Sequence, residues 1–247
     1  MDISGKVALI TGGSNGIGEG VARYLAAGGA HVVLADIDDS RGKAVADELN
    51  GVYVHTDVAD PAASVAAVAT AVDAFGALHI AHLNAGITSW CGMGDDFDAE
   101  AYRGSMAINL DGVVYGIAAA RPAIKVSGGG TIVATASMAG LVAAPFDPIY
   151  SANKHAVVGL ARSLGETYAA DGIRVHALCP SFARTNIIKG SEQTLVDMGF
   201  PIIEVADVVD AFGRILDSET TGQCWYVVAG RESEPFQFRR APGPRLD

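Results

Sequence analysis

Short runs of apolar and β-branched residues alternate with longer amphipathic stretches along the whole chain. Apolar runs of four to eight residues that are bounded by glycine or polar residues are typical of buried strands. The runs predict strands at 7–10, 31–35, 52–55, 78–83, 131–135, 174–178 and 224–228. The stretches between them predict helices at 16–27, 39–49, 62–75, 99–126, 150–170 and 205–216.

This alternation of strand and helix predicts the fold class. Strands that are separated by helices form a parallel sheet with helices on both faces, joined by right-handed crossovers. We expect an α/β, doubly wound Rossmann fold with a seven-stranded parallel sheet, in a single domain over residues 1–230. Ligands of such folds bind beyond the carboxyl ends of the strands. The residues that follow each strand are therefore the first candidates for chemistry.

Composition narrows the classes of partner and compartment. The chain has 247 residues, half of them hydrophobic, which is enough for one large core. A net charge of −11 without a basic patch argues against nucleic acid. No signal-peptide pattern precedes the first strand, and no apolar stretch reaches the roughly 20 residues of a membrane helix. Three scattered cysteines and six scattered histidines indicate neither disulfides nor a metal site, so we expect a cytoplasmic protein.

A glycine-rich turn at 11–18 lies between the first predicted strand and the first predicted helix. Its glycines let backbone N–H groups approach a phosphate, and the helix N-terminus adds a partial positive charge. The turn lacks the Gly-Lys-Ser/Thr end of a P-loop, which disfavours nucleotide hydrolysis. The turn predicts a pyrophosphate site, although it could serve only to pack helix against strand. The candidate residues are Gly12, Ser14, Asn15, Gly16, Ile17 and Gly18.

The end of the second predicted strand indicates which nucleotide binds. Asp36 lies 18 residues after Gly18, where a carboxylate can accept hydrogen bonds from ribose hydroxyls and repels a 2′-phosphate. Neither Asn15 nor Ile37 supplies a cation that could hold such a phosphate. We therefore predict NAD rather than NADP, with Asp36 and Ile37 at the adenosine. Two alternatives remain open: Arg41 could weaken the preference, and Asp36 could be only a helix cap.

Tyr150 and Lys154 are four residues apart on a predicted helix, so their side chains share one face. An ammonium about 5 Å from a phenol favours the phenolate by roughly 3 kcal/mol, or about 2 pKa units, at an effective dielectric constant of about 20. The pair therefore predicts a tyrosine that acts as general acid or base near neutral pH. Alone, this spacing also occurs by chance in many helices.

Together these motifs resemble the short-chain dehydrogenase/reductase family over nearly the whole chain, as an NAD-preferring member. The family's catalytic tetrad matches, in order, Asn109, Ser137, Tyr150 and Lys154. The resemblance also implies cofactor contacts by Asp57, Val58, Asn84, Ala85, Gly86, Pro180 and Thr185, together with Tyr150 and Lys154. Two positions differ from the family pattern, which often has a second Asn at Leu83 and Gly at Ser181.

The resemblance implies an oxidoreductase that interconverts a secondary alcohol and its ketone by hydride transfer with NAD. Tyr150 would move the hydroxyl proton and Ser137 would bind the substrate oxygen. Lys154 would lower the pKa of Tyr150 and bind the nicotinamide ribose, and Asn109 would hold a water that links Lys154 to solvent. Two alternatives stay open: an NAD(P)H-dependent reductase of a 3-oxoacyl or other biosynthetic carbonyl substrate, and a nucleotide-sensing scaffold protein.

Apolar residues after the fourth, fifth and sixth predicted strands predict an apolar small-molecule substrate. The candidate wall residues are Trp90, Met138, Leu141, Phe146, Phe182 and Ile187. Each of them could equally be ordinary core. The segment at 186–200 is short for a deep lid, which indicates an open site.

The last segment, residues 231–247, differs from the rest in having three prolines and two aromatic residues. One interpretation is an arm that lies across a neighbouring subunit of a homo-oligomer, with a tetramer favoured over a dimer. The other is a frayed terminus.

Overall fold

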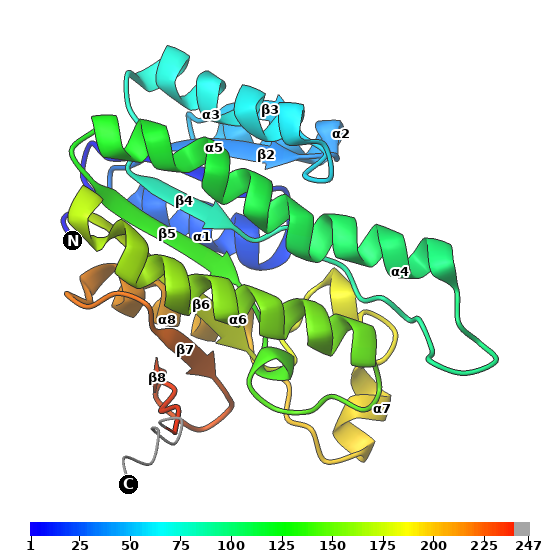
Figure 1. The fold of residues 1–247 in the computed structure, drawn as a ribbon. Coiled ribbons are helices and arrows are strands. Elements are labelled where there is room, and N and C mark those ends of the chain that lie inside the picture. Colours follow the sequence, from blue (N-terminus) through cyan, green and yellow to red (C-terminus); the bar gives the residue numbers. More distant parts are fainter. Residues whose placement is uncertain (240–247) are drawn as a thin grey trace, which may run out of the picture.

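The computed structural model describes residues 1–239 and centres on one twisted sheet (Figure 1). In this part of the chain the strand order is β3-β2-β1-β4-β5-β6-β7-β8, and all neighbours are parallel except β7 and β8. The strands are β1 (Val7–Thr11), β2 (His31–Asp36), β3 (Val52–His55), β4 (Ile80–Leu83), β5 (Gly130–Thr135), β6 (Ile173–Pro180), β7 (Cys224–Val227) and β8 (Glu234–Pro235). The predicted α/β class is confirmed, but the short antiparallel β8 makes eight strands where seven were expected.

Helices cover both faces of the sheet, as the doubly wound class requires. Those that contribute to the core on one face are α1, α2 and α8, and those on the other are α3, α5 and α6. The helices are α1 (Gly16–Ala27), α2 (Asp39–Glu48), α3 (Pro61–Phe75), α4 (Ala99–Met106), α5 (Gly112–Val126), α6 (Pro148–Tyr168), α7 (Glu192–Asp197) and α8 (Val205–Asp217).

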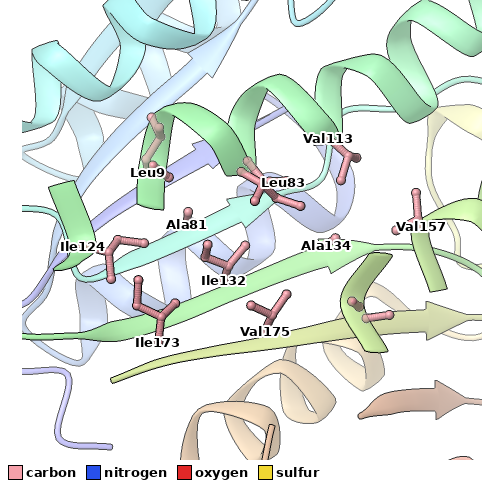
Figure 2. Packing of buried hydrophobic residues seen from close by; sticks show 14 of the residues in the cluster. Leu9, Ala81, Leu83, Val113, Ile124, Ile132, Ala134, Val157, Ile173 and Val175 are labelled. Atoms are coloured by element: carbon pink, nitrogen blue, oxygen red, sulfur yellow. The ribbon is translucent and has the colours of Figure 1, made fainter. Parts of the chain in front are cut away.

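The central strands are mostly apolar because they supply both cores. Leu9 faces the helices α3, α5 and α6, while its neighbour Ile10 faces α1, α2 and α8. Figure 2 shows the first of these cores, where Ile132 and Val175 of adjacent strands lie beneath the helices. A strand that is buried on both faces cannot alternate apolar with polar residues, which explains the continuous runs in the sequence.

Two helical regions differ from the prediction. The helix expected at 99–126 is continuous but contains a π turn at Ala107–Asp111, between α4 and α5. Such turns occur often at functional sites, and this one contains the fully buried Asn109. The segment at 186–200, which was expected to be a loop too short to form a deep lid, contains the short helix α7.

The winding of the chain reverses beside β1, which pairs with β2 on one side and with β4 on the other. The chain leaves β1 for a helix on one face and leaves β4 for a helix on the opposite face. The two connections therefore diverge, and a crevice between them is the usual ligand site of this fold. Thr11 and Leu83, which are paired in register, mark the carboxyl ends of the two strands.

The final segment turns back onto its own sheet. Glu234 and Pro235 pair with β7, and the backbone N–H of Phe236 donates to the carbonyl of Cys224 at 2.7 Å. Phe238 packs against the core, and the guanidinium of Arg162 lies 3.9 Å from the centre of its ring. The predicted intersubunit arm spans 231–247, of which 240–247 lie outside the described residues, and it stays a prediction.

Candidate active site

The turn between β1 and α1 requires glycine at several positions. Gly12 and Gly16 have φ values of +63° and +56°, in the left-handed region. A Cβ on Gly18 would lie 2.0 Å from the carbonyl oxygen of Gly12, so no larger residue fits. Asn15 begins α1 without a side-chain capping bond, which leaves the first N–H groups of the helix for another acceptor. The buried hydroxyl of Ser14 also has no partner within residues 1–239.

The segment after β6 meets the same turn. A Cβ on Gly16 would lie 3.2 Å from the methyl carbon of Thr185. Pro180 ends β6, and the hydroxyl of the following Ser181 is buried without a partner in the described chain. Ile17 packs partly into the core beneath α1. The structure thus brings together two predicted cofactor segments that are about 170 residues apart in sequence.

Asp36 anchors the turn from the end of β2. One carboxylate oxygen accepts from the N–H of Ser14 at 2.9 Å, and the other accepts from the N–H of Asp38 at 3.1 Å. Asp38, rather than Asp36, caps α2, so the alternative of a helix cap does not hold for Asp36. Ile37 is exposed beside it.

Arg41 is already paired with an acid of the first helix. Its guanidinium bonds both carboxylate oxygens of Glu19, at 2.7 and 2.8 Å, and the carbonyl of Ser14 at 3.2 Å. Arg23 bonds Glu19 as well. The cation that could weaken a preference for NAD is therefore held by a carboxylate.

The strand β4 ends in a hydrogen-bonded hub at Asn84. Its side-chain amide donates to the carbonyls of Thr11 and Gly12 and accepts from the hydroxyl of Thr135. The N–H groups of Asn84 and Ala85 both donate to the hydroxyl of Thr11. These bonds fix the carboxyl ends of β1, β4 and β5 relative to one another.

The next strand end, after β3, contributes less. Asp57 is exposed, and its carboxylate accepts only from the N–H of Ala59, at 2.9 Å. Val58 is buried beneath Gly112 at the start of α5, where a Cβ would lie 2.8 Å from it. The structure therefore places Asp57 and Val58 just after the end of β3, and their contact with the cofactor stays a prediction.

The four predicted catalytic residues come from different elements and meet beyond the sheet. Ser137 follows β5, Tyr150 and Lys154 lie on α6, and Asn109 lies in the π turn. The ammonium of Lys154 lies 5.4 Å from the centre of the Tyr150 ring and donates to the carbonyl of Thr135 at 2.8 Å. The hydroxyl of Ser137 accepts from the N–H of Ala139 and lies 3.4 Å from the carbonyl oxygen of Pro180.

Asn109 holds the segment that follows β4. Its carbonyl oxygen accepts from the N–H of Ile87, and its amide donates to the carbonyl of the same residue, both at 2.8 Å. A Cβ on Gly86 would lie 3.1 Å from the oxygen of Asn109 and 3.4 Å from the ammonium of Lys154. Glycine thus allows the chain to pass directly over the side chain of Lys154.

Burial governs the protonation of the Tyr150 and Lys154 pair. It raises the pKa of Tyr150 to about 12, against an interaction with Ser137 that lowers it. It lowers the pKa of Lys154 to about 8. The pKa of Tyr150 is therefore raised in this structure, not lowered as expected, because desolvation disfavours the phenolate. At neutral pH the pair is a phenol beside a largely protonated amine.

A cavity of about 370 Å³ opens beside the start of α6. Of the predicted wall residues, Trp90 and Phe146 line it, together with Met93, Asp96 and Pro148. Other lining residues are Cys91, Gly92 and Pro145.

The other predicted wall residues do not line this cavity. Phe182 joins Phe146 only through Phe200, whose ring centre lies 5.3 Å from the first and 6.0 Å from the second. Leu141 packs against the core and Ile187 is exposed. Met138 lies in the 3₁₀ turn after β5.

Motif matching did not identify Asp147, which is buried directly before α6. Its carboxylate accepts from the N–H groups of Ser89, Trp90 and Tyr150, at 2.8, 3.2 and 2.9 Å. The sequence did contain a signal, since Asp followed by Pro148 is typical of a helix N-cap and N1 position. That signal predicts a cap, but not a contact with a segment 57 and 58 residues away.

The strand ends fit a dinucleotide with a redox group beside the tyrosine. The glycine turn leaves a cradle that a Cβ would fill, α1 begins with free N–H groups, and the buried hydroxyls of Ser14 and Ser181 lack partners within residues 1–239.

No group of three metal-ligating side chains occurs in the same part of the chain. No described helix is long and apolar enough to cross a membrane.

Comparisons with known proteins agree with this geometry. The family model for short chain dehydrogenase matches residues 6–195. A 3-alpha-(or 20-beta)-hydroxysteroid dehydrogenase of Mycobacterium tuberculosis is 38% identical, over 92% of this chain and 89% of the relative. A cyclohexanol dehydrogenase of an Acinetobacter species is 37% identical, over 91% and 94%. The crystal structure of a 3-ketoacyl-(acyl-carrier-protein) reductase from Brucella melitensis with NADH superposes with a TM-score of 0.85, at 30% identity over 93% and 99%.

Proposed function

The chain belongs to the short-chain dehydrogenase family, and on this premise we propose that it is an NAD-dependent enzyme that interconverts an apolar secondary alcohol and its ketone. The family makes it an oxidoreductase that acts on alcohol or ketone substrates. The choice of NAD, the role of Tyr150 and the apolar substrate are the proposal.

The observation that carries the proposal is the meeting of Ser137, Tyr150 and Lys154 beside the glycine turn. A Cβ on Gly86 would lie 3.4 Å from the ammonium of Lys154, and a Cβ on Gly16 would lie 3.2 Å from the methyl carbon of Thr185, so both segments pass close to these side chains. A substrate oxygen at Tyr150 and a dinucleotide on the turn would therefore share one crevice.

The residues divide the chemistry among them. When bound, the nicotinamide would accept or give the hydride. Ser137 binds the substrate oxygen and holds it at the phenolic oxygen of Tyr150. As the phenolate, Tyr150 takes the alcohol proton in oxidation; as the phenol, it gives its proton to the forming alkoxide in reduction. Lys154 places a positive charge beside Tyr150 and binds the nicotinamide ribose. Asn109 fixes the segment over Lys154, and a relay water near it remains part of the proposal.

NAD is supported by the charges at the end of β2. Asp36 directs a buried carboxylate to the turn, and Glu19 occupies the guanidinium of Arg41. A ribose 2′-phosphate would meet a carboxylate there and no unpaired cation from Arg41. The structural neighbour that contains NADH supports a nicotinamide cofactor of the same kind.

An apolar alcohol is supported by the cavity and by the relatives. Trp90, Phe146 and Met93 supply aromatic and aliphatic parts of the cavity wall, which also includes the carboxylate of Asp96. The hydroxysteroid and cyclohexanol dehydrogenases act on ring alcohols by their names. We therefore expect a cyclic or similarly apolar secondary alcohol.

A second candidate is the reduction of a 3-oxoacyl substrate, which the structural neighbour favours by its title. A carrier-bound acyl substrate and NADPH both bring additional negative charge to the site. The carboxylates of Asp36, Asp95 and Asp96 would repel that charge. A scaffold protein would not need the complete tetrad that this chain has.

The test compares cyclic and linear secondary alcohols, ketones and a 3-oxoacyl thioester, each with NAD(H) and NADP(H), by absorbance of the reduced cofactor. We expect turnover of apolar alcohols with NAD. Tyr150→Phe should lower kcat by about 10²–10⁴-fold, the usual size of a general acid–base contribution, while NADH affinity stays within about twofold. Tyr168→Phe, at the far end of the same helix, is the matched control. Near wild-type turnover in Tyr150→Phe would refute the mechanism, and preferential use of NADP would refute the cofactor assignment.

A further inference from the structure

We propose that Asp147 is a positioning residue that holds the start of the catalytic helix and the wall of the substrate cavity in one fixed relation. This inference rests on the proposed function, because it assigns a role to a residue outside the tetrad. Asp147 touches no reacting atom in this account and acts through Tyr150 and Trp90.

The contacts of Asp147 join two segments that are distant in sequence. One carboxylate oxygen accepts from the N–H of Tyr150, and the other accepts from the N–H groups of Ser89 and Trp90. The hydroxyl of Ser89 bonds the carboxylate as well and accepts from the N–H of Cys91 at 3.2 Å. A carboxylate is an acceptor only, so it can satisfy all these donors without a competing N–H group.

The contact also stabilises an unusual backbone. Trp90 has a φ of +47°, and it is one of two residues other than glycine in the left-handed region within residues 1–239. Bulky residues persist in this region only where the surroundings hold them. The indole of Trp90 is 72% exposed, so side-chain burial does not supply that hold. The hydrogen bond to Asp147 is therefore the visible restraint on the cavity wall.

The same carboxylate acts on the acid/base group. Its negative charge raises the pKa of Tyr150, a smaller effect than that of burial. The other groups that face Tyr150 are Ser137 after β5, Cys179 on β6 and Lys154 on its own helix. Removal of the charge should thus favour the phenolate and lower the pKa of Tyr150.

The experiment compares Asp147→Ala and Asp147→Asn with Asp60→Ala. Asp60 caps α3 with a side-chain bond to the N–H of Ala62 and lies outside the site, so it controls for the loss of a helix cap. We expect Asp147→Ala to raise KM for the alcohol about tenfold or more and to lower kcat, with NADH affinity within about twofold. In Asp147→Asn, the acidic limb of the kcat profile for alcohol oxidation should move to lower pH by about half a unit. Kinetics and a pH profile like those of Asp60→Ala would overturn the proposal.

A second measurement does not need turnover. The chain has two tryptophans, so a Trp225→Phe background leaves Trp90 as the single reporter. In this background, Asp147→Ala should lower the fluorescence anisotropy of Trp90, and Asp60→Ala should not. Unchanged anisotropy would overturn the proposal.

If wild-type protein oxidises no alcohol, the proposed function fails, yet the anisotropy still decides whether Asp147 holds Trp90. If Asp147→Ala does not fold, Ser89→Ala provides a milder test because it removes only one contact of Asp147. We then expect a smaller rise in KM and a smaller fall in the anisotropy of Trp90 than for Asp147→Ala.

Discussion

At the scale of single residues, a carboxylate can determine both the shape and the selectivity of a nucleotide site. Asp36 orients the glycine turn through the N–H of Ser14, and it also places negative charge where a 2′-phosphate would lie. Glu19 supports the same choice from a distance, because it keeps the guanidinium of Arg41 occupied. The proposed preference for NAD would thus depend on two carboxylates: Asp36, which would repel a 2′-phosphate, and Glu19, which keeps Arg41 from binding one.

We expect Asp36→Ala to raise the kcat/KM ratio of NADP to NAD by about tenfold or more, since tenfold corresponds to about 1.4 kcal/mol. Absolute activity with NAD should fall because the turn loses its anchor. Adding Glu19→Gln should raise the ratio further by releasing Arg41. Asp47→Ala, on the exposed face of α2, is the control. An unchanged ratio in the double variant would show that neither carboxylate selects the cofactor.

At the scale of elements, the ends of β1, β4 and β5 are locked by one directed chain of hydrogen bonds. Thr135 donates its only hydroxyl proton to Asn84 and must therefore accept from the ring of His82, at 3.0 Å. Asn84 then donates to the carbonyls of Thr11 and Gly12. The ring of His82 also lies on Phe212 of α8, with centres 4.8 Å apart. The core of one face is thereby connected to the cofactor turn.

Burial lowers the pKa of His82 to about 3, so it stays neutral in the folded protein. The unfolded chain takes up a proton below about pH 6.5, which makes folding less favourable as the pH falls. Between pH 6.5 and 4 the loss from His82 amounts to about 3 kcal/mol. His82→Gln should remove this slope from the free energy of unfolding, measured by urea titration across that range. The exposed His31→Gln is the control, and an identical slope in His82→Gln would contradict the prediction.

The sequence predicted the elements that bury much apolar surface and missed those set by a few contacts. Short apolar runs located the seven parallel strands, and the runs are most continuous in the central strands, which are buried on both faces. The sequence predicted one continuous helix over 99–126 and missed the π turn at Asn109. The spacing of Tyr150 and Lys154 indicated an acid/base pair, and the family resemblance implied Ser137. The contact between Asp147 and Trp90 depends on tertiary structure alone, and no local pattern encodes it.

At the scale of the whole molecule, residues 234–238 add a short strand to the sheet and pack against its core. Phe238 packs on the core beneath Arg162, and the hydroxyl of Tyr226 donates to Glu234 at 2.5 Å. Such contacts favour a role within the subunit over the predicted arm. The two roles predict different results when the segment is removed.

Deletion of the residues after Gly230 should lower Tm by roughly 5–10 °C. Burial of one phenylalanine contributes about 1.5–3 kcal/mol, and each kcal/mol shifts Tm by about 2–4 °C at this chain length. The oligomeric mass, measured by light scattering, should stay the same. Phe238→Ala in the full chain should reproduce part of the loss. A smaller mass with an unchanged Tm would instead identify the segment as an intersubunit arm.

The strand β8 has a further consequence for how copies of the protein meet. A free β7 would present unpaired N–H and carbonyl groups, a template on which other chains can assemble and aggregate. Glu234 and Pro235 pair with these groups of β7. Pro235 has no backbone N–H, so it cannot donate a hydrogen bond to a further strand. The opposite border, β3, has only four residues. Sheet growth from copy to copy is thus blocked at one border and limited at the other, which favours association through helical surfaces and protects the protein at high concentration.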